Sequence, residues 1–238
     1  MGAVWGVVSG KFVITAAGLL IASRIDQGRL EALVTPHVAI SAVSRNFAEQ
    51  HHLAVSGAAQ TGTRRPLTIG IGAEEIDQAN LAVAERMPAM DADMVIGRDL
   101  LTAHVFALDV DRRDLSLLGK GDVERLPRHF VAAPLTISDE DQLRLTITIN
   151  GVRTEAAIHL GQTDPLKVGT SFWQSSPPAQ GEAAHIAIGR AELNDIPWPG
   201  ETIVSDRVTL GLDAFKGRRI VLDLPHGRLW ISDAPANR

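Results

Sequence analysis

The sequence contains no cysteine and no tyrosine, and its aromatic residues make up only 4% of 238 residues. Without cysteine, the protein has no disulfide framework, no thiol nucleophile and no thiolate ligand for a metal ion. The same absence leaves the compartment open, because either a cytoplasmic or a periplasmic location is compatible with it. No apolar run approaches the length that a helix needs to span a bilayer, so we expect no membrane span.

Concentrated charge is also missing. Asp and Glu number 28 against 23 Lys and Arg, which gives a net charge of −5, and no dense basic run appears. Neither feature favours a nucleic-acid partner. The apolar start, MGAVWGVVSGKFVITAAGLLIAS, lacks the basic segment of a signal peptide and is interrupted by Lys11. We therefore expect this stretch to form the first strands of the fold.

The sequence does contain a repeat. MVIGRDLLTAHVFALD at 94–109 and VTLGLDAFKGRRIVLD at 208–223 both have two mostly apolar residues, Gly, any residue and Asp, with Leu-Asp nine residues later. Two shorter matches lie in the same order: GRLEALV (28–34) with GVRTEAAI (151–158), and IGAEEI (71–76) with IGRAEL (188–193). Coincidence between short Ala- and Leu-rich strings is the alternative, and the long final match weighs against it. The order indicates a duplicated domain whose second copy has shorter loops.

The segment between the copies, GKGDVERLPRHFVAAP at 119–134, carries Gly, Pro and charge without periodicity. We therefore predict a first domain at 1–120, a linker at 121–134 and a second domain at 135–238.

Within each copy the patterns are typical of β-structure. LRLTITINGV at 143–152 alternates apolar and polar residues and then turns at Asn-Gly. Two further stretches, 106–118 and 219–232, each predict a pair of short strands around a polar turn. Helical patterns are short, at 44–53 and after Asp99 and Asp213, which we expect to be N-caps. The expected fold class is all-β.

The motifs VIGRD at 95–99 and TLGLD at 209–213 resemble the closing motif of retropepsin-like aspartic proteases. In that family a catalytic Asp-Thr-Gly loop follows a strand pair that lies earlier in the chain, here GRLEALV and GVRTEAAI. The resemblance covers both halves. It implies two similar retropepsin- or pepsin-like β-barrel lobes in one chain, a monomeric pseudo-dimer with a cleft between the lobes.

The sequence departs from this family at the catalytic loops. Thr35-Pro36-His37 and His159-Leu160-Gly161 stand where the resemblance places Asp-Thr-Gly. Aspartic proteolysis needs two carboxylates that share a proton, so that one acts as base and the other as acid. A threonine hydroxyl has no useful basicity, and His159 is a base without an acidic partner. The resemblance together with this departure predicts an aspartic-peptidase-like chain that lacks the catalytic residues of the family.

Two other aspartates are candidates to replace the missing acids. Asp26 lies in Ile-Asp-Gln-Gly, which resembles the catalytic loop, but the repeat pairs it with the hairpin turn Ile-Asn-Gly at 149–151. Asp164 follows His159 by five residues and could lie near the mouth of the cleft, although an Asp before Pro is typical of a turn.

The leading hypothesis is therefore a degenerate aspartic-protease-like protein that binds an extended peptide or protein segment. The candidate cleft residues are Thr35, Pro36, His37, His159, Leu160, Gly161 and Asp164. A retained flap is expected at 56–72, with a stiffer counterpart at 175–189. No cofactor or metal is expected, because His37 and His159 on facing loops lack a third ligand.

Two alternatives stay open at this point. One is a hydrolase, an aspartic-type peptidase or an enzyme with altered His or Asp chemistry, that retains activity in the cleft. The other is a structural protein whose cleft is filled by Pro36, His37 and Leu160, which are bulkier than the residues of the family loop.

Overall fold

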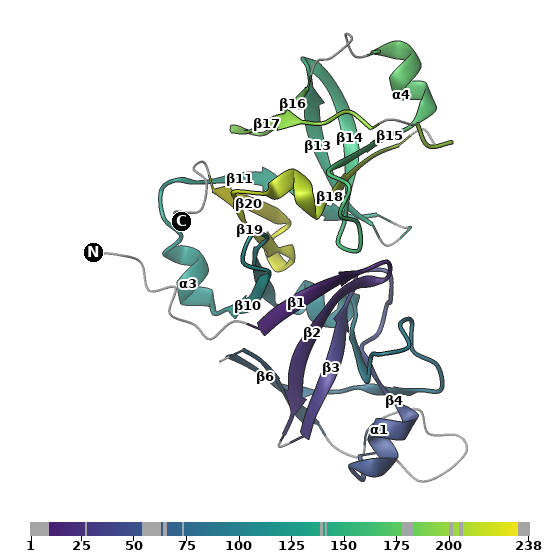
Figure 1. Cartoon of the computed structure of the whole chain (residues 1–238). Coiled ribbons are helices and arrows are strands. Elements are labelled where there is room, and N and C mark those ends of the chain that lie inside the picture. The colour runs from purple at the N-terminus through teal and green to yellow at the C-terminus, as the bar shows by residue number, and fades with distance from the viewer. Residues whose placement is uncertain are drawn as a thin grey trace.

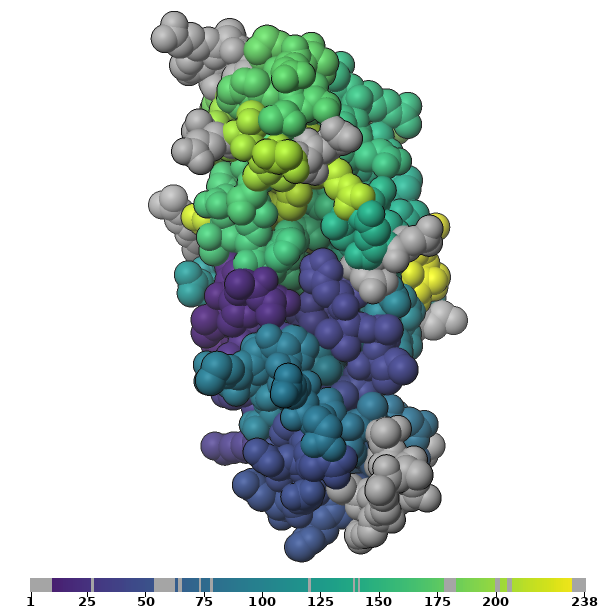
Figure 2. Space-filling model, turned by 90° about the vertical axis from the view of Figure 1, so that its right-hand side faces the viewer, coloured from purple at the N-terminus to yellow at the C-terminus, as the bar shows by residue number. Residues whose placement is uncertain are grey.

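The computed structural model describes residues 10–26, 28–53, 63, 66–72, 74–138, 140, 142–177, 183–199, 202–204 and 207–232. These residues form a mostly β protein with a few short helices. The molecule is elongated, with the second half of the chain at one end and the first half at the other (Figures 1 and 2). No helix among the described residues is long and apolar enough to cross a membrane.

The larger sheet contains thirteen strands, in the order β11-β20-β19-β9-β10-β1-β2-β3-β8-β4-β7, with β5 on β2 and β6 on β5. The strands of its first-half portion are β1 (Gly10–Thr15), β2 (Gly18–Ile25), β3 (Gly28–Val34), β4 (Ala42–Ser44), β5 (Leu67–Ile71), β6 (Glu74–Ala79), β7 (Ala82–Ala84), β8 (Met94–Ile96), β9 (Val105–Asp109) and β10 (Asp114–Leu118). Its remaining strands are β11 (Phe130–Pro134), β19 (Arg219–Asp223) and β20 (Arg228–Ser232).

The smaller sheet contains seven strands, in the order β15-β18-β14-β13-β16-β17, with β12 on β13. Its strands are β12 (Thr136–Ile137), β13 (Leu143–Ile149), β14 (Val152–His159), β15 (Leu166–Val168), β16 (Ala184–Ile188), β17 (Ala191–Ile196) and β18 (Val208–Gly211). Strand β13 alternates buried and accessible residues as the sequence predicts, because its apolar side chains face the core and its polar ones do not.

The helices are short: α1 (Arg45–Gln50), α2 (Arg98–Ala103), α3 (Lys120–Glu124), α4 (Thr170–Ser175), and the 3₁₀ turns η1 (Leu212–Phe215) and η2 (Leu224–His226). Ser44 caps α1 by accepting a hydrogen bond from the Phe47 amide. The prediction that Asp99 and Asp213 are N-caps is wrong. Gly97 and Gly211 occupy the cap positions, and both aspartates lie in the first turn.

The two halves share one pairing pattern. In the first, the hairpin β2–β3 is followed by β8, which runs parallel to β3 and pairs Val34 with Ile96. In the second, the hairpin β13–β14 is followed by β18, which runs parallel to β14 and pairs Ile158 with Leu210. The repeated sequences therefore build equivalent strands, and duplication remains our interpretation of their origin.

The hairpin turns also correspond. Asp26 and Asn150 both have positive φ, 50° and 46°, a conformation that Asp and Asn tolerate in tight turns. Asp26 is thus a turn residue, as its pairing with Asn150 predicts, and not part of a catalytic loop.

The repeated glycine has a steric cause in both halves. A Cβ on Gly97 would lie 2.6 Å from the Val38 carbonyl oxygen, and one on Gly211 would lie 2.7 Å from that of Gln162. The next amide along, of Arg98 or Leu212, donates to that same carbonyl at 2.8 and 2.9 Å. Only a residue without a side chain allows the loop after β3 or β14 to approach this closely.

The middle of the molecule is one antiparallel set that joins the halves. Strand β19 pairs with β9 across the sequence, with Arg219 opposite Asp109. The predicted linker 121–134 contributes most of α3 and all of β11, which pairs with β20. This segment is therefore built into the sheet that connects the two copies.

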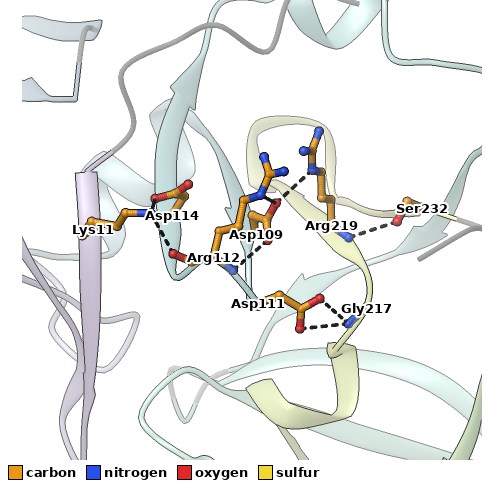
Figure 3. Close-up of polar contacts among 8 residues, drawn as sticks. All are labelled: Lys11, Asp109, Asp111, Arg112, Asp114, Gly217, Arg219 and Ser232. Atoms are coloured by element: carbon orange, nitrogen blue, oxygen red, sulfur yellow. Dashed lines mark hydrogen bonds and ion pairs between the residues drawn. The ribbon is translucent and has the colours of Figure 1, made fainter. Parts of the chain in front are cut away.

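Polar contacts reinforce this junction (Figure 3). The buried Asp109 carboxylate accepts from Arg219 Nε at 3.1 Å, and the Asp111 carboxylate accepts from the Gly217 amide at 3.0 and 3.1 Å. Lys11 pairs with Asp114 at 2.6 Å beside the same turn. The junction thus combines backbone pairing with the Asp109–Arg219 ion pair and the Asp111–Gly217 hydrogen bonds, whereas the Lys11–Asp114 pair joins β1 to β10 within the first half.

The expected flap is only partly described. Of 56–72, residues 67–71 form β5, whose apolar residues are buried and which pairs with β2 through Gly70 and Ile69. This portion is core and not a flap. Of the counterpart 175–189, residues 184–188 form β16, and 178–182 lie outside the described residues, as do most of the remaining residues of 56–72.

Candidate functional site

The candidate site lies where the loops after β3 and β14 meet. The first loop begins at Thr35, and the second follows His159, the last residue of β14; the repeat makes Thr35 and His159 equivalent. The rings of His37 and His159 face each other with centroids 5.3 Å apart and planes inclined by 44°. The structure therefore brings the two expected loops together, and imidazoles occupy the meeting point.

A turn of the first half holds the two loops in place. The β1–β2 turn presents the carbonyl oxygens of Thr15 and Ala16 to Gly161, where a Cβ would lie 2.5 and 2.7 Å from them. The same turn packs through Gly18 against Val34 and Thr35. One turn thus contacts both loops, and Gly161 permits the contact because it has no side chain. Figure 2 shows the purple N-terminal strands against the green second half at this level.

The environment of His159 selects one of its neutral forms. The Gly161 amide donates a hydrogen bond to His159 Nδ1 at 3.1 Å. A ring nitrogen that accepts a hydrogen bond carries no proton, so the proton of neutral His159 lies on Nε2. Nε2–H is therefore the donor that remains available for another group.

Both imidazoles favour the neutral form. Partial burial holds the pKa of His37 below its ordinary value. Burial, and then the neighbouring charges of His37 and Lys167, hold the pKa of His159 below its ordinary value. Two neutral imidazoles are weak bases and hydrogen-bonding groups near pH 7, and they do not reproduce a proton-sharing acid pair.

The other tripeptide residues point inward. Thr35 is 1% exposed, Pro36 is buried, and Leu160 is 2% exposed in the main apolar core. These three side chains are buried, so they pack beneath the two loops and are not exposed to solvent. Burial of Pro36 and Leu160 is compatible with the filled cleft of the structural alternative, which stays a hypothesis. His37 is exposed and His159 is half-buried, so these two remain for contact with a ligand.

Among the described residues, the Asp164 side chain interacts with a lysine and not with either imidazole. Its carboxylate is exposed and pairs with Lys167 at 3.5 Å. It lines a hollow of about 440 Å³ that also has Trp198 and three prolines in its walls. Trp198 packs edge-to-face on Trp173 with centroids 5.8 Å apart, beside the core, as expected for structural tryptophans.

Sequence reasoning missed the group that fixes the first loop. Ser41 is fully buried, donates from Oγ to the Asp99 carboxylate at 2.6 Å, and accepts from the Gly97 amide at 2.8 Å. The Ser41 amide donates to the same carboxylate at 2.9 Å. The second half has Pro165 at the equivalent position, which has no amide hydrogen, and Asp213 pairs with Lys216 instead. The sequence signal for this contact was the Asp that both copies of the motif contain, Asp99 and Asp213.

Within the described part of the chain, no three His, Asp or Glu side chains converge in a way that would hold a metal ion. The imidazole pair offers two ligands, which is fewer than protein zinc sites use.

No protein-family model matches this chain, and no curated protein matches it by sequence. The fold does match solved structures. The aspartic proteinase from Irpex lacteus aligns over 95% of this chain and 97% of its own, with a TM-score of 0.61 at 11% identity. Basic 7S globulin from soybean aligns over 96% of this chain and 95% of its own, with a TM-score of 0.58 at 11% identity. The chain therefore has the fold of pepsin-like aspartic proteinases.

Proposed function

We propose that this chain is a catalytically silent relative of the aspartic proteases that binds an extended peptide or protein segment. In this proposal residues 1–120 and 135–238 are two retropepsin- or pepsin-like barrel lobes, 121–134 is the connection, and the ligand lies between the lobes. The protein works as a monomeric pseudo-dimer and needs no cofactor.

The observation that carries the proposal is the identity of the facing side chains. Thr35 and His159 stand at the two positions that the family fills with catalytic aspartates; Thr35 is buried, and His37 from the same loop faces His159. General acid and general base catalysis each contribute roughly 100- to 10,000-fold to a rate. Loss of both carboxylates removes both contributions, so peptide hydrolysis falls toward the uncatalysed rate.

Binding makes smaller demands than catalysis. An extended peptide is held by backbone hydrogen bonds and by pockets for alternate side chains, neither of which needs an acid pair. The loop beside His37 offers apolar contact area, because Ile40 is 60% exposed and Val38 is half-buried. These residues are suited to the apolar side chains of a bound segment.

The test is selection from a peptide library, with binding and cleavage measured on the same sample between pH 3 and pH 8. We expect enrichment of apolar-containing peptides and no turnover. Ile40→Glu should abolish binding, whereas Val152→Glu should not, because Val152 begins β14 at the end opposite His159. Absence of any enriched peptide, or equal loss in both variants, contradicts the proposal.

A second candidate is a hydrolase with altered chemistry. The observation that favours it is that His159 is held neutral beside a second imidazole, so it has a free-base form near pH 7. In that case the cleavage assay shows turnover that His159→Ala abolishes and that His185→Ala, on the distant β16, leaves unchanged.

A further inference from the structure

The imidazole pair is a donor site at the centre of the molecule. His159 Nε2–H is directed away from the Gly161 amide by the hydrogen bond at Nδ1. The ring of His37 faces it from the other half, 5.3 Å between centroids. A group that contacts both rings at the edge of the pair therefore has to accept a hydrogen bond from His159.

The charged side chains around the pair balance each other, so they do not repel an anion. Lys167 is the cation whose charge acts on His159, and Asp164 is its partner at 3.5 Å. The other elements at the site, the turn at 15–18 and the loop at 36–41, contain no charged residue apart from the imidazole of His37 when protonated. No fixed carboxylate in these segments competes for the imidazoles.

We infer that His37 and His159 form a carboxylate-binding site, which takes the side chain of an acidic residue within the bound segment. This inference rests on the proposed function, since it names the ligand group of the same site. A carboxylate has two oxygens, so it can accept one hydrogen bond from each of two adjacent rings at the edge of the pair. The apolar Val38 and Ile40 beside the pair suit apolar residues next to the acidic one.

Binding of the carboxylate is coupled to protonation. A neighbouring negative charge favours the imidazolium form and raises the pKa of both rings. The complex therefore takes up protons, so affinity rises as the pH falls from 7.5 to 5.5. The Glu side chain stays ionised over this interval, because its ordinary pKa is about 4.3.

The experiment uses blocked seven-residue peptides in three pools, with Glu, Gln or Lys at the centre and the other positions randomised, in the presence of a chelator. Hydrogen bonds to a charged group contribute about 1.5–3 kcal/mol, so the Glu pool should bind about tenfold or more tightly than the Gln pool at pH 5.5. The preference should shrink at pH 7.5. It should be lost in His159→Gln and His37→Gln and kept in His185→Gln, since His185 lies at the opposite end of the hairpin β13–β14.

The outcomes separate this inference from the proposed function. Equal binding of the Glu and Gln pools overturns the carboxylate site and leaves peptide binding standing. No binding in any pool overturns both. If the histidine variants unfold, acetate provides the second measurement on the intact protein: saturating acetate should raise the pKa of His159 and His37 in an NMR titration, and unchanged values overturn the inference.

Discussion

Gly161 is the residue at which the contact between the two halves can be tested by a single methyl group. In Gly161→Ala the new Cβ would lie 2.5 Å from the Thr15 carbonyl oxygen and 2.7 Å from that of Ala16. Ordinary contact begins near 3.4 Å, so the turn has to retreat by 3.4 − 2.5 = 0.9 Å. It cannot do so freely, because Gly18 of the same turn is already packed on Val34.

Overpacking of this kind costs about 1–3 kcal/mol. For a protein of this size each kcal/mol lowers Tm by about 2–4 °C, so we expect a decrease of about 2–12 °C. The assay is thermal and urea unfolding of Gly161→Ala beside Gly121→Ala. Gly121 lies in α3 with nothing within 4 Å of its Cβ position, so alanine there should stabilise by up to about 1 kcal/mol. Wild-type stability of Gly161→Ala would refute the close contact between the turn and the second loop.

Three further outcomes follow from the site. His37→Gln should raise the pKa of His159, because the charge of His37 is one of the causes that lower this pKa. A histidine NMR titration measures the change, and an unchanged pKa of His159 would mean that the two rings do not interact. Ser41→Ala should lower the free energy of unfolding, measured in urea, by about 1–3 kcal/mol, because the Asp99 carboxylate and the Gly97 amide each lose a hydrogen-bond partner. An effect below about 0.5 kcal/mol would show that this contact contributes little to stability. Burial holds the pKa of His37, His104 and His159 below the unfolded value near 6.5, so the unfolded chain binds more protons than the folded one. The free energy of unfolding should therefore fall as the pH decreases from 7.5 to 5.5. A free energy of unfolding that does not change over this interval would contradict these shifts.

The sequence was sufficient for the features that depend on local pattern and repetition. Alternation in LRLTITI predicts β13, and the match between Asp26 and Asn150 predicts equivalent turns. The tripeptides after the two strands predict which loops meet, and His37 and His159 do face each other.

The features that the sequence did not predict depend on contacts between distant segments. Strand β11 lies in a stretch without periodicity and is a strand only because β20 supplies its partner. The burial of Thr35 and Leu160 is set by the direction in which each loop leaves its strand, which residue type does not encode. Ser41 gains its role from a carboxylate 58 residues away.

The measurement that tests the central claim most directly is an NOE experiment on protein with isotope-labelled histidine, of which the chain has 8. The account places the rings of His37 and His159 in contact across the two halves, with Thr35 and His159 at the positions of the family's acid pair. It predicts a cross-peak between their ring protons. Assigned rings with no cross-peak, each titrating independently of the other, would contradict it.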